Sequence, residues 1–216
     1  MIGRSARRVA ALALFAATAP VVAEAACPPL DEAPRRWVVQ GDGTKIHMQP
    51  NPRLAGRFAP PGSFLETMAC VNDATHPWKV RPFGGGLPGY VSEASIRPAR
   101  GMDGKIPLGP DRTRARVRRG DFDATATIPC AQNPGEALGT CTARAARGAA
   151  GDARVAVTFA NGFSRELSFV NGAFIRANAT MSGVGTDTAW SLEGDTFVVR
   201  VDDQQYRVPT ALVLGP

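Results

Sequence analysis

The stretch 153–176, ARVAVTFANGFSRELSFVNGAFIR, decides the fold of the second half of the chain. Apolar and polar residues alternate in two runs, Ala153–Phe159 and Ser164–Val170, with the period of a half-buried β-strand. The pairs Asn161-Gly162 and Asn171-Gly172 follow these runs, and Asn-Gly between alternating runs is the strongest short-range signal of a β-hairpin. The stretch therefore predicts an antiparallel meander.

The same alternation continues on both sides of the meander. The further runs lie at 122–128, 140–145, 188–192, 196–201 and 205–208. Helical spacing is almost absent, and seven or eight antiparallel strands in one unit are typical of a β-sandwich or small barrel. We predict such an antiparallel β domain over residues 121–216.

Composition narrows the class of protein. The chain is 44% hydrophobic and 20% charged, values that fit neither disorder nor a membrane protein. With 23 Gly and 18 Pro among 216 residues, turns are expected to outnumber long helices. The two histidines and the absence of a CxxC pair argue against a histidine-rich metal site and a zinc ribbon. We expect no metal and no cofactor.

Residues 1–25 have the pattern of a secretory signal peptide. Basic residues at the start precede an apolar run over 9–22, which is too short to span a bilayer, and Ala23 and Ala25 are small residues suited to cleavage. We predict cleavage after Ala25 and a periplasmic or secreted protein without a transmembrane segment. A lipid anchor on Cys27 is the competing interpretation, but Glu24 stands where a lipobox has an apolar residue.

The four cysteines form an even set, and pairing is the default in an oxidising compartment. Three connectivities are possible. Cys130 and Cys141 flank a turn-rich stretch, so a local disulfide between them is favoured, and Cys27 is then left to pair with Cys70. We predict these two disulfides.

Residues 100–120 hold most of the positive charge, with seven basic and two acidic residues. Gly and Pro disfavour a regular element in the first half, and we predict a linker between a domain at 26–99 and the domain at 121–216. Five arginines crowd its second half: Arg112, Arg114, Arg116, Arg118 and Arg119. They are candidates for contact with an anionic surface, and a solvated hinge is the simpler alternative. No aromatic residue lies between them to stack on bases, so we expect no nucleic-acid partner.

The first domain shows short alternating runs broken by turn residues about every 8–12 positions, a spacing typical of an all-β sandwich or barrel, and we predict a small β-barrel. The runs lie at 37–39, 45–49, 64–70, 78–83 and 89–96, and Gly84-Gly-Gly86 is expected to be a hairpin turn. In the second run Ile46 and Met48 share one face, which places His47 toward solvent. His76 is expected in a loop.

This succession resembles the bacterial SH3-like (SH3b) domain over residues 36–98. The matching segments are Ile46-His-Met-Gln49 with Asn51-Pro52, Gly62-Ser63, Trp78-Lys-Val80 and Gly89-Tyr-Val91. Gln49 and Asn51 depart from the Arg and Gly of the family motif. The resemblance implies recognition of a cell-wall peptide, peptidoglycan or another envelope ligand rather than catalysis. Trp78 and Tyr90 are the candidates for the ligand face, and a position in the barrel core is the alternative for each.

No histidine follows His76, and no nucleophile has an evident base beside it, so we predict that the protein is not an enzyme. The second domain is faintly similar to periplasmic lysozyme inhibitors. The similarity covers the 155–162 run, Ser182-Gly183-Val184, Trp190 and Glu193-Gly-Asp195. It implies, as an alternative function, a periplasmic inhibitor or protein-interaction module that presents the Ser182-Gly183-Val184 loop to an envelope protein.

Overall fold

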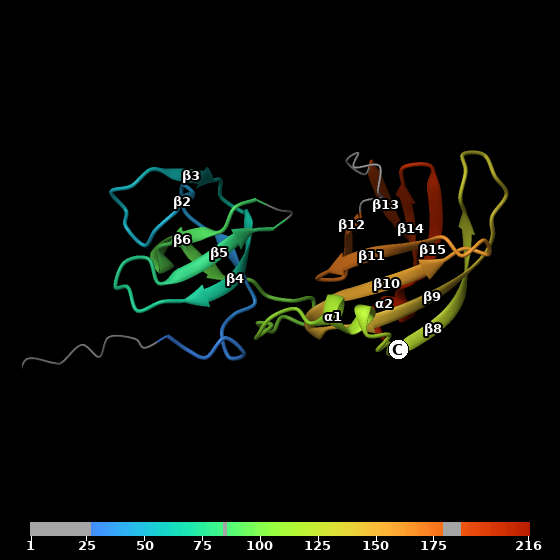
Figure 1. The fold of residues 1–216 in the computed structure, drawn as a ribbon, viewed down its shortest axis with the longest axis horizontal. Helices are drawn as coiled ribbons and strands as arrows, with labels where there is room; N and C mark the ends of the chain where they lie inside the picture. Colours follow the sequence, from blue (N-terminus) through green and yellow to red (C-terminus); the bar gives the residue numbers. More distant parts are fainter. Residues whose placement is uncertain (1–26, 84–85, 179–186) are drawn as a thin grey trace, which may run out of the picture.

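The computed structural model describes residues 27–83, 86–178 and 187–216. The predicted signal peptide, Gly84 and Gly85 of the expected turn, and the Ser182-Gly183-Val184 loop lie outside these ranges. The described chain forms two antiparallel sheets and only short helices (Figure 1). The all-β prediction is confirmed.

The first sheet has seven short strands in the spatial order β3-β2-β6-β5-β4-β1-β7. The strands are β1 (Arg36–Val39), β2 (Thr44–His47), β3 (Gly56–Ala59), β4 (Phe64–Cys70), β5 (Trp78–Pro82), β6 (Gly89–Val91) and β7 (Ile96–Pro98), and the 3-10 helix η1 (Glu93–Ser95) precedes β7. Its core is built from inward-facing apolar residues such as Leu65 and Val80. Trp37 and Trp78 meet in this core with ring centroids 4.6 Å apart.

Two details of the first sheet differ from the sequence prediction. Strand β3 was not predicted, because Arg57 and Phe58 are both exposed on this edge strand and leave no alternation to detect. Met48 was expected to share the buried face of Ile46, but β2 ends at His47 and Met48 is exposed. The alternation therefore holds only as far as the strand itself extends.

The second sheet has eight strands in the order β12-β11-β10-β9-β8-β15-β14-β13. The strands are β8 (Ala124–Ala131), β9 (Gly139–Arg147), β10 (Ala153–Thr158), β11 (Ser164–Val170), β12 (Ala173–Ala177), β13 (Thr188–Glu193), β14 (Thr196–Val201) and β15 (Gln204–Pro209); η2 (Ala149–Gly151) lies between β9 and β10. Asn171 and Gly172 both have positive φ, as a two-residue type I′ hairpin turn requires. The predicted meander is confirmed.

The second sheet curls until its two edge strands approach each other. β12 and β13 come within 8 Å, Cα to Cα, although no ladder of hydrogen bonds joins them in the described residues. The interior is filled by aromatic and branched side chains, among them Phe169, Phe197 and Tyr206. Helix α2 (Thr210–Leu214) adds Leu212 and Val213 to this core. The result is a nearly closed barrel.

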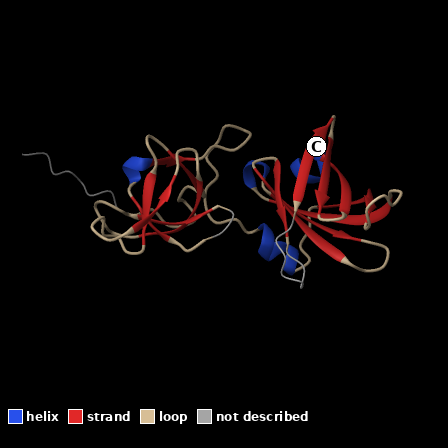
Figure 2. Ribbon diagram, turned by 90° about the horizontal axis from the view of Figure 1, so that it is seen from above, coloured by secondary structure: helices blue, strands red, loops and turns tan. Residues whose placement is uncertain are grey.

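Residues 100–120 connect the two sheets, which Figure 1 and Figure 2 show as separate units. The amide of Gly109 donates to the carbonyl of Ala33, and the amide of Arg35 donates to the carbonyl of Pro107. Helix α1 (Thr113–Arg118) packs against β9 and β10 of the second sheet. The segment is therefore hydrogen-bonded to the first unit and packed on the second.

A buried ionic cluster also joins the two units. Asp152, which is 1% exposed and directly precedes β10, receives Arg35 Nη1 at 2.7 Å and Arg36 Nη2 on the same carboxylate oxygen. Its other oxygen accepts the amide of Asn171. Because Arg35 and Arg36 come from the first unit, Asp152 fixes the start of β1 against the β11–β12 turn.

Candidate functional site

Tyr90 lies in a row of polar side chains across the outer face of the first sheet. In the strand register, Tyr90 opposes His47 of β2 on one side and Lys79 of β5 on the other. Directly opposed residues project from the same face of an antiparallel sheet. The Lys79 Nζ atom lies 5.7 Å from the centroid of the Tyr90 ring, within the range of a cation–π contact. The row thus combines an aromatic surface with an amine.

His47, which opposes Tyr90 in this row, meets the second histidine of the chain, His76. The ring centroids of His47 and His76 are 5.1 Å apart, with the rings edge to face. His47, expected to face solvent, is only 4% exposed, so that expectation is wrong. Gly56 opposes His47 in the register and carries no side chain, and the loop that bears His76 covers the remaining side. Tertiary cover, rather than strand alternation, buries the ring.

Hydrogen bonds define the neutral form of both rings. His47 Nδ1 lies 2.9 Å from the Leu54 carbonyl oxygen, which can only accept, so Nδ1 carries the proton. The Thr75 hydroxyl donates to Asp73 and therefore accepts from His76 Nδ1, 3.0 Å away. In each neutral ring Nε2 is left with a free lone pair.

The environment disfavours a second proton on His76. Burial lowers its pKa below the ordinary 6.5, the charge of His47 lowers it further, and Asp73 opposes the shift. Two imidazoles alone make an incomplete metal site, because structural zinc uses four protein ligands. Within the described ranges, no three His, Cys, Asp or Glu side chains are grouped to hold a metal ion. The two packed rings therefore form a buried histidine pair whose His47 lies next to Tyr90 in the strand register.

The two predicted ligand-face aromatics have different positions. Trp78 is 4% exposed and packs on Trp37, so the core alternative describes its position. Its indole Nε1 has no hydrogen-bond partner among the described residues. Tyr90 is partly exposed beside Lys79 and remains available to a ligand.

The five predicted anion-contact arginines also divide into two groups. Arg116 forms ion pairs with Asp121 and Asp123, and these carboxylates raise the pKa of its guanidinium. It also donates to the Arg147 carbonyl. The other four are exposed and form no ion pair with a described residue: Arg112, Arg114, Arg118 and Arg119. A free cationic surface is therefore present on and beside α1.

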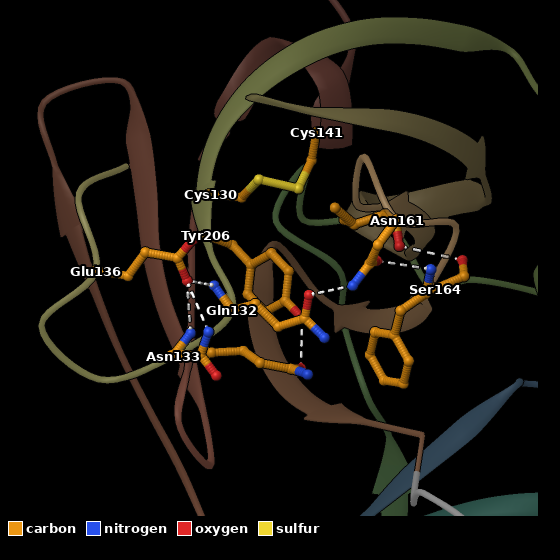
Figure 3. Close-up of a disulfide and its surroundings, with 11 residues drawn as sticks. Cys130, Gln132, Asn133, Glu136, Cys141, Asn161, Ser164 and Tyr206 are labelled. Carbon is orange, nitrogen blue, oxygen red and sulfur yellow. Dashed lines mark hydrogen bonds between the residues drawn. A yellow bond between two sulfur atoms is a disulfide. The ribbon is translucent and has the colours of Figure 1, made fainter. Parts of the chain in front are cut away.

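Both predicted disulfides, Cys27–Cys70 and Cys130–Cys141, are present. Figure 3 shows the loop that the second one closes: the Glu136 carboxylate accepts the amides of Gln132 and Asn133. These hydrogen bonds lower the pKa of Glu136. The side chain of Asn161 donates to that of Gln132 and so ties the loop to the β10–β11 turn. We attribute this hydrogen-bond network to the structure of the loop and not to a binding site.

The β13 edge of the barrel carries exposed apolar side chains. Trp190 is 44% exposed although its ring centroid lies 6.0 Å from that of the buried Phe197, and Leu192 on the same face is 55% exposed. β13 pairs only with β14 among the described strands. Its other edge faces β12 across the seam of the barrel, and no described strand forms a hydrogen-bonded ladder with it there.

Comparison of the chain with models of known protein families, with curated proteins and with solved structures finds no match. None of the helices in the described ranges has the length and apolar character needed to cross a bilayer. The assignment of function therefore rests on the residues themselves.

Proposed function

We propose that the protein is an exported, non-enzymatic binding protein of the cell envelope. Its first unit, which resembles an SH3b domain, binds a cell-wall peptide or another envelope ligand through the outer face of the sheet. Two disulfides are compatible with a periplasmic or secreted location and support export. The signal-peptide pattern of residues 1–25 points to the same compartment.

The observation that carries the proposal is the pairing of Tyr90 with Lys79. A partly exposed ring gives a large apolar contact area at low entropic cost, and its hydroxyl can hydrogen-bond to a peptide. The adjacent ammonium suits a peptide carboxylate. His47 and His76 pack together beside Tyr90 on this face, and Trp78 lies in the core. The arrangement presents a binding surface on a rigid sheet.

Sedimentation with purified peptidoglycan tests this proposal. The processed protein is mixed with insoluble peptidoglycan at low and at physiological salt, and the bound fraction is measured. Tyr90→Ala with Lys79→Ala is expected to abolish binding. Trp190→Ala, which removes an exposed aromatic residue from the other unit, is the matched control and is expected to retain it.

A third variant separates recognition from charge. It replaces the four unpaired arginines of the linker, Arg112, Arg114, Arg118 and Arg119, by Gln. Binding lost only in this variant would make the linker the anchor and would contradict a role for Tyr90. No binding by the unmodified protein at low salt would remove peptidoglycan as the ligand.

The exposed apolar side chains of β13 favour one alternative, an inhibitor or interaction module acting through the second unit. Here an envelope protein would pack on Trp190 and Leu192. A retained partner in pull-downs from envelope extract, lost on Trp190→Ala and kept on Tyr90→Ala, would support this alternative over the first proposal.

A further inference from the structure

A cavity of about 250 Å³ lies where the two units and the linker meet. Each segment contributes arginines or polar groups to its wall. Its lining includes Asp31, Arg35, Arg112, Thr113, Arg116 and Arg147. The cavity therefore gathers four guanidinium groups and one carboxylate from residues that are up to 116 positions apart in the chain.

The four arginines differ in how many of their N–H donors are already used in hydrogen bonds. Arg116 uses all five of its N–H groups on Asp121, Asp123 and a carbonyl. Arg35 is neutralised by Asp152 and also donates to two carbonyl oxygens. Arg116 and Arg35 therefore line the cavity, but their charges are already paired and they are not available to bind a ligand.

Arg112 and Arg147 keep unsatisfied donors. The Arg147 guanidinium donates to the carbonyl oxygens of Ala211 and Leu212, which carry no full charge, and the Arg147 backbone amide donates to Asp123. Arg112 makes no side-chain hydrogen bond within the described chain, and neither guanidinium has a described carboxylate within 4.0 Å. Two uncompensated cations at one cavity favour an oxyanion, which accepts hydrogen bonds from a guanidinium in matching geometry.

The size of the cavity limits what it can hold. Sites for drug-sized ligands measure roughly 300–1,000 Å³, so this cavity suits a single small acidic group. Asp31 is the one lining carboxylate without a cationic partner among the described ion pairs, and it weakens the field for an anion. Its removal should strengthen binding, whereas loss of Arg112 should weaken it.

We propose that this junction cavity is a binding site for a small oxyanion, a phosphate or carboxylate group, held by Arg112 and Arg147. The site is distinct from the Tyr90 face and goes beyond the envelope-binding function. Because its walls come from both units, an occupant would bind the described fold only while the two units stay docked. Binding would thus stabilise the folded chain by an amount that grows with the logarithm of the anion concentration once that concentration exceeds the dissociation constant.

Calorimetric titration of the processed full chain tests the proposal. Inorganic phosphate and acetate are titrated separately in chloride buffers of equal ionic strength. We expect saturable millimolar binding of at least one anion, and the two arms separate a phosphate from a carboxylate site. Arg112→Gln should weaken binding about tenfold, the loss expected for one charge-assisted hydrogen bond, and Asp31→Asn should strengthen it.

Arg114→Gln is the matched control, because Arg114 carries the same charge on the same helix and does not line the cavity. It should bind as the unmodified protein does. Equal losses in Arg112→Gln and Arg114→Gln would show non-specific attraction and overturn the proposal. So would the absence of saturable binding of either anion. Neither result depends on the peptidoglycan experiment, which probes Tyr90.

Discussion

Replacement of Asp152 by Asn removes the one carboxylate that neutralises Arg35 and Arg36. The Asn side chain has the same shape as Asp and keeps an oxygen that accepts the Asn171 amide, so the substitution changes only the charge. Both guanidinium groups are nearly as buried as Asp152, with side chains 11% and 7% exposed. Breaking a buried pair in this way costs about 3–5 kcal/mol.

We expect the lower end of that range, about 3 kcal/mol, because Arg35 keeps its bonds to the carbonyl oxygens of Leu108 and Gly109. For a chain of this length, about 3 kcal/mol lowers the melting temperature by roughly 6–12 °C. The two unpaired guanidinium groups lie at the start of β1, so the first unit should unfold before the second.

The assay uses the placement of the three tryptophans. Trp37 and Trp78 lie in the first unit and Trp190 in the second, so fluorescence in a Trp190→Phe background reports the first unit alone. Circular dichroism reports both sheets. In Asp152→Asn the fluorescence midpoint in urea should fall below the dichroism midpoint, whereas in the parent the two should coincide.

Asp187→Asn is the control, because it breaks an exposed ion pair with Arg200 and should leave both midpoints unchanged. A melting temperature within about 2 °C of the parent for Asp152→Asn, with coincident transitions, would refute the reasoning. It would mean that the two units are held together by the linker alone.

Three further predictions follow from particular contacts. Thr113→Val keeps the shape of the side chain but removes a buried hydroxyl that has no hydrogen-bond partner among the described residues, so the free energy of unfolding in urea should rise by up to about 1 kcal/mol. A fall of more than about 1 kcal/mol would show that the hydroxyl does have a partner. Because the pKa of His76 is lowered in the folded protein, the unfolded chain binds the proton more readily, so the contribution of His76 to stability is complete above about pH 6.5 and is lost as the pH falls toward the folded pKa. Urea unfolding midpoints measured from pH 7.5 to 5.5 should show this loss, and His76→Gln should make the midpoint less dependent on pH. Replacing each disulfide by a pair of Ala residues should lower the free energy of unfolding by roughly 3 kcal/mol for Cys130–Cys141, which spans 11 positions, and by about 4 kcal/mol for Cys27–Cys70, which spans 43. The reverse ranking in chemical denaturation would contradict the loop-entropy explanation.

The sequence predicted the second sheet better than the first, and the reason is local. The runs 164–170 and 196–201 coincide with β11 and β14 because one face of each strand meets the barrel core and the other meets solvent or a helix. In the first sheet β3 lies at an edge with its middle residues exposed, and no pattern marks it. Short helices such as α2, placed by core packing of Leu212, were missed for the same reason.

The candidate sites depend on contacts that no local pattern reveals. His47 and His76 are 29 positions apart and meet only because a loop folds over β2. Arg112 was singled out from its charge, but Arg147, its partner at the junction cavity, belongs to a strand with no unusual spacing. Tyr90 was placed on the ligand face through a family resemblance, and its Lys79 neighbour follows from register alone.

The ionic cluster at Asp152 also sets an order of events during synthesis. Arg36 precedes Asp152 by 116 positions, so at about 5–20 residues per second the ribosome adds the acid roughly 6–23 s after the base. All seven strands of the first sheet are complete by residue 98, well before that. For this interval the nascent first sheet carries two guanidinium groups without their counter-ion, and its final docking waits for a residue that the ribosome has not yet added.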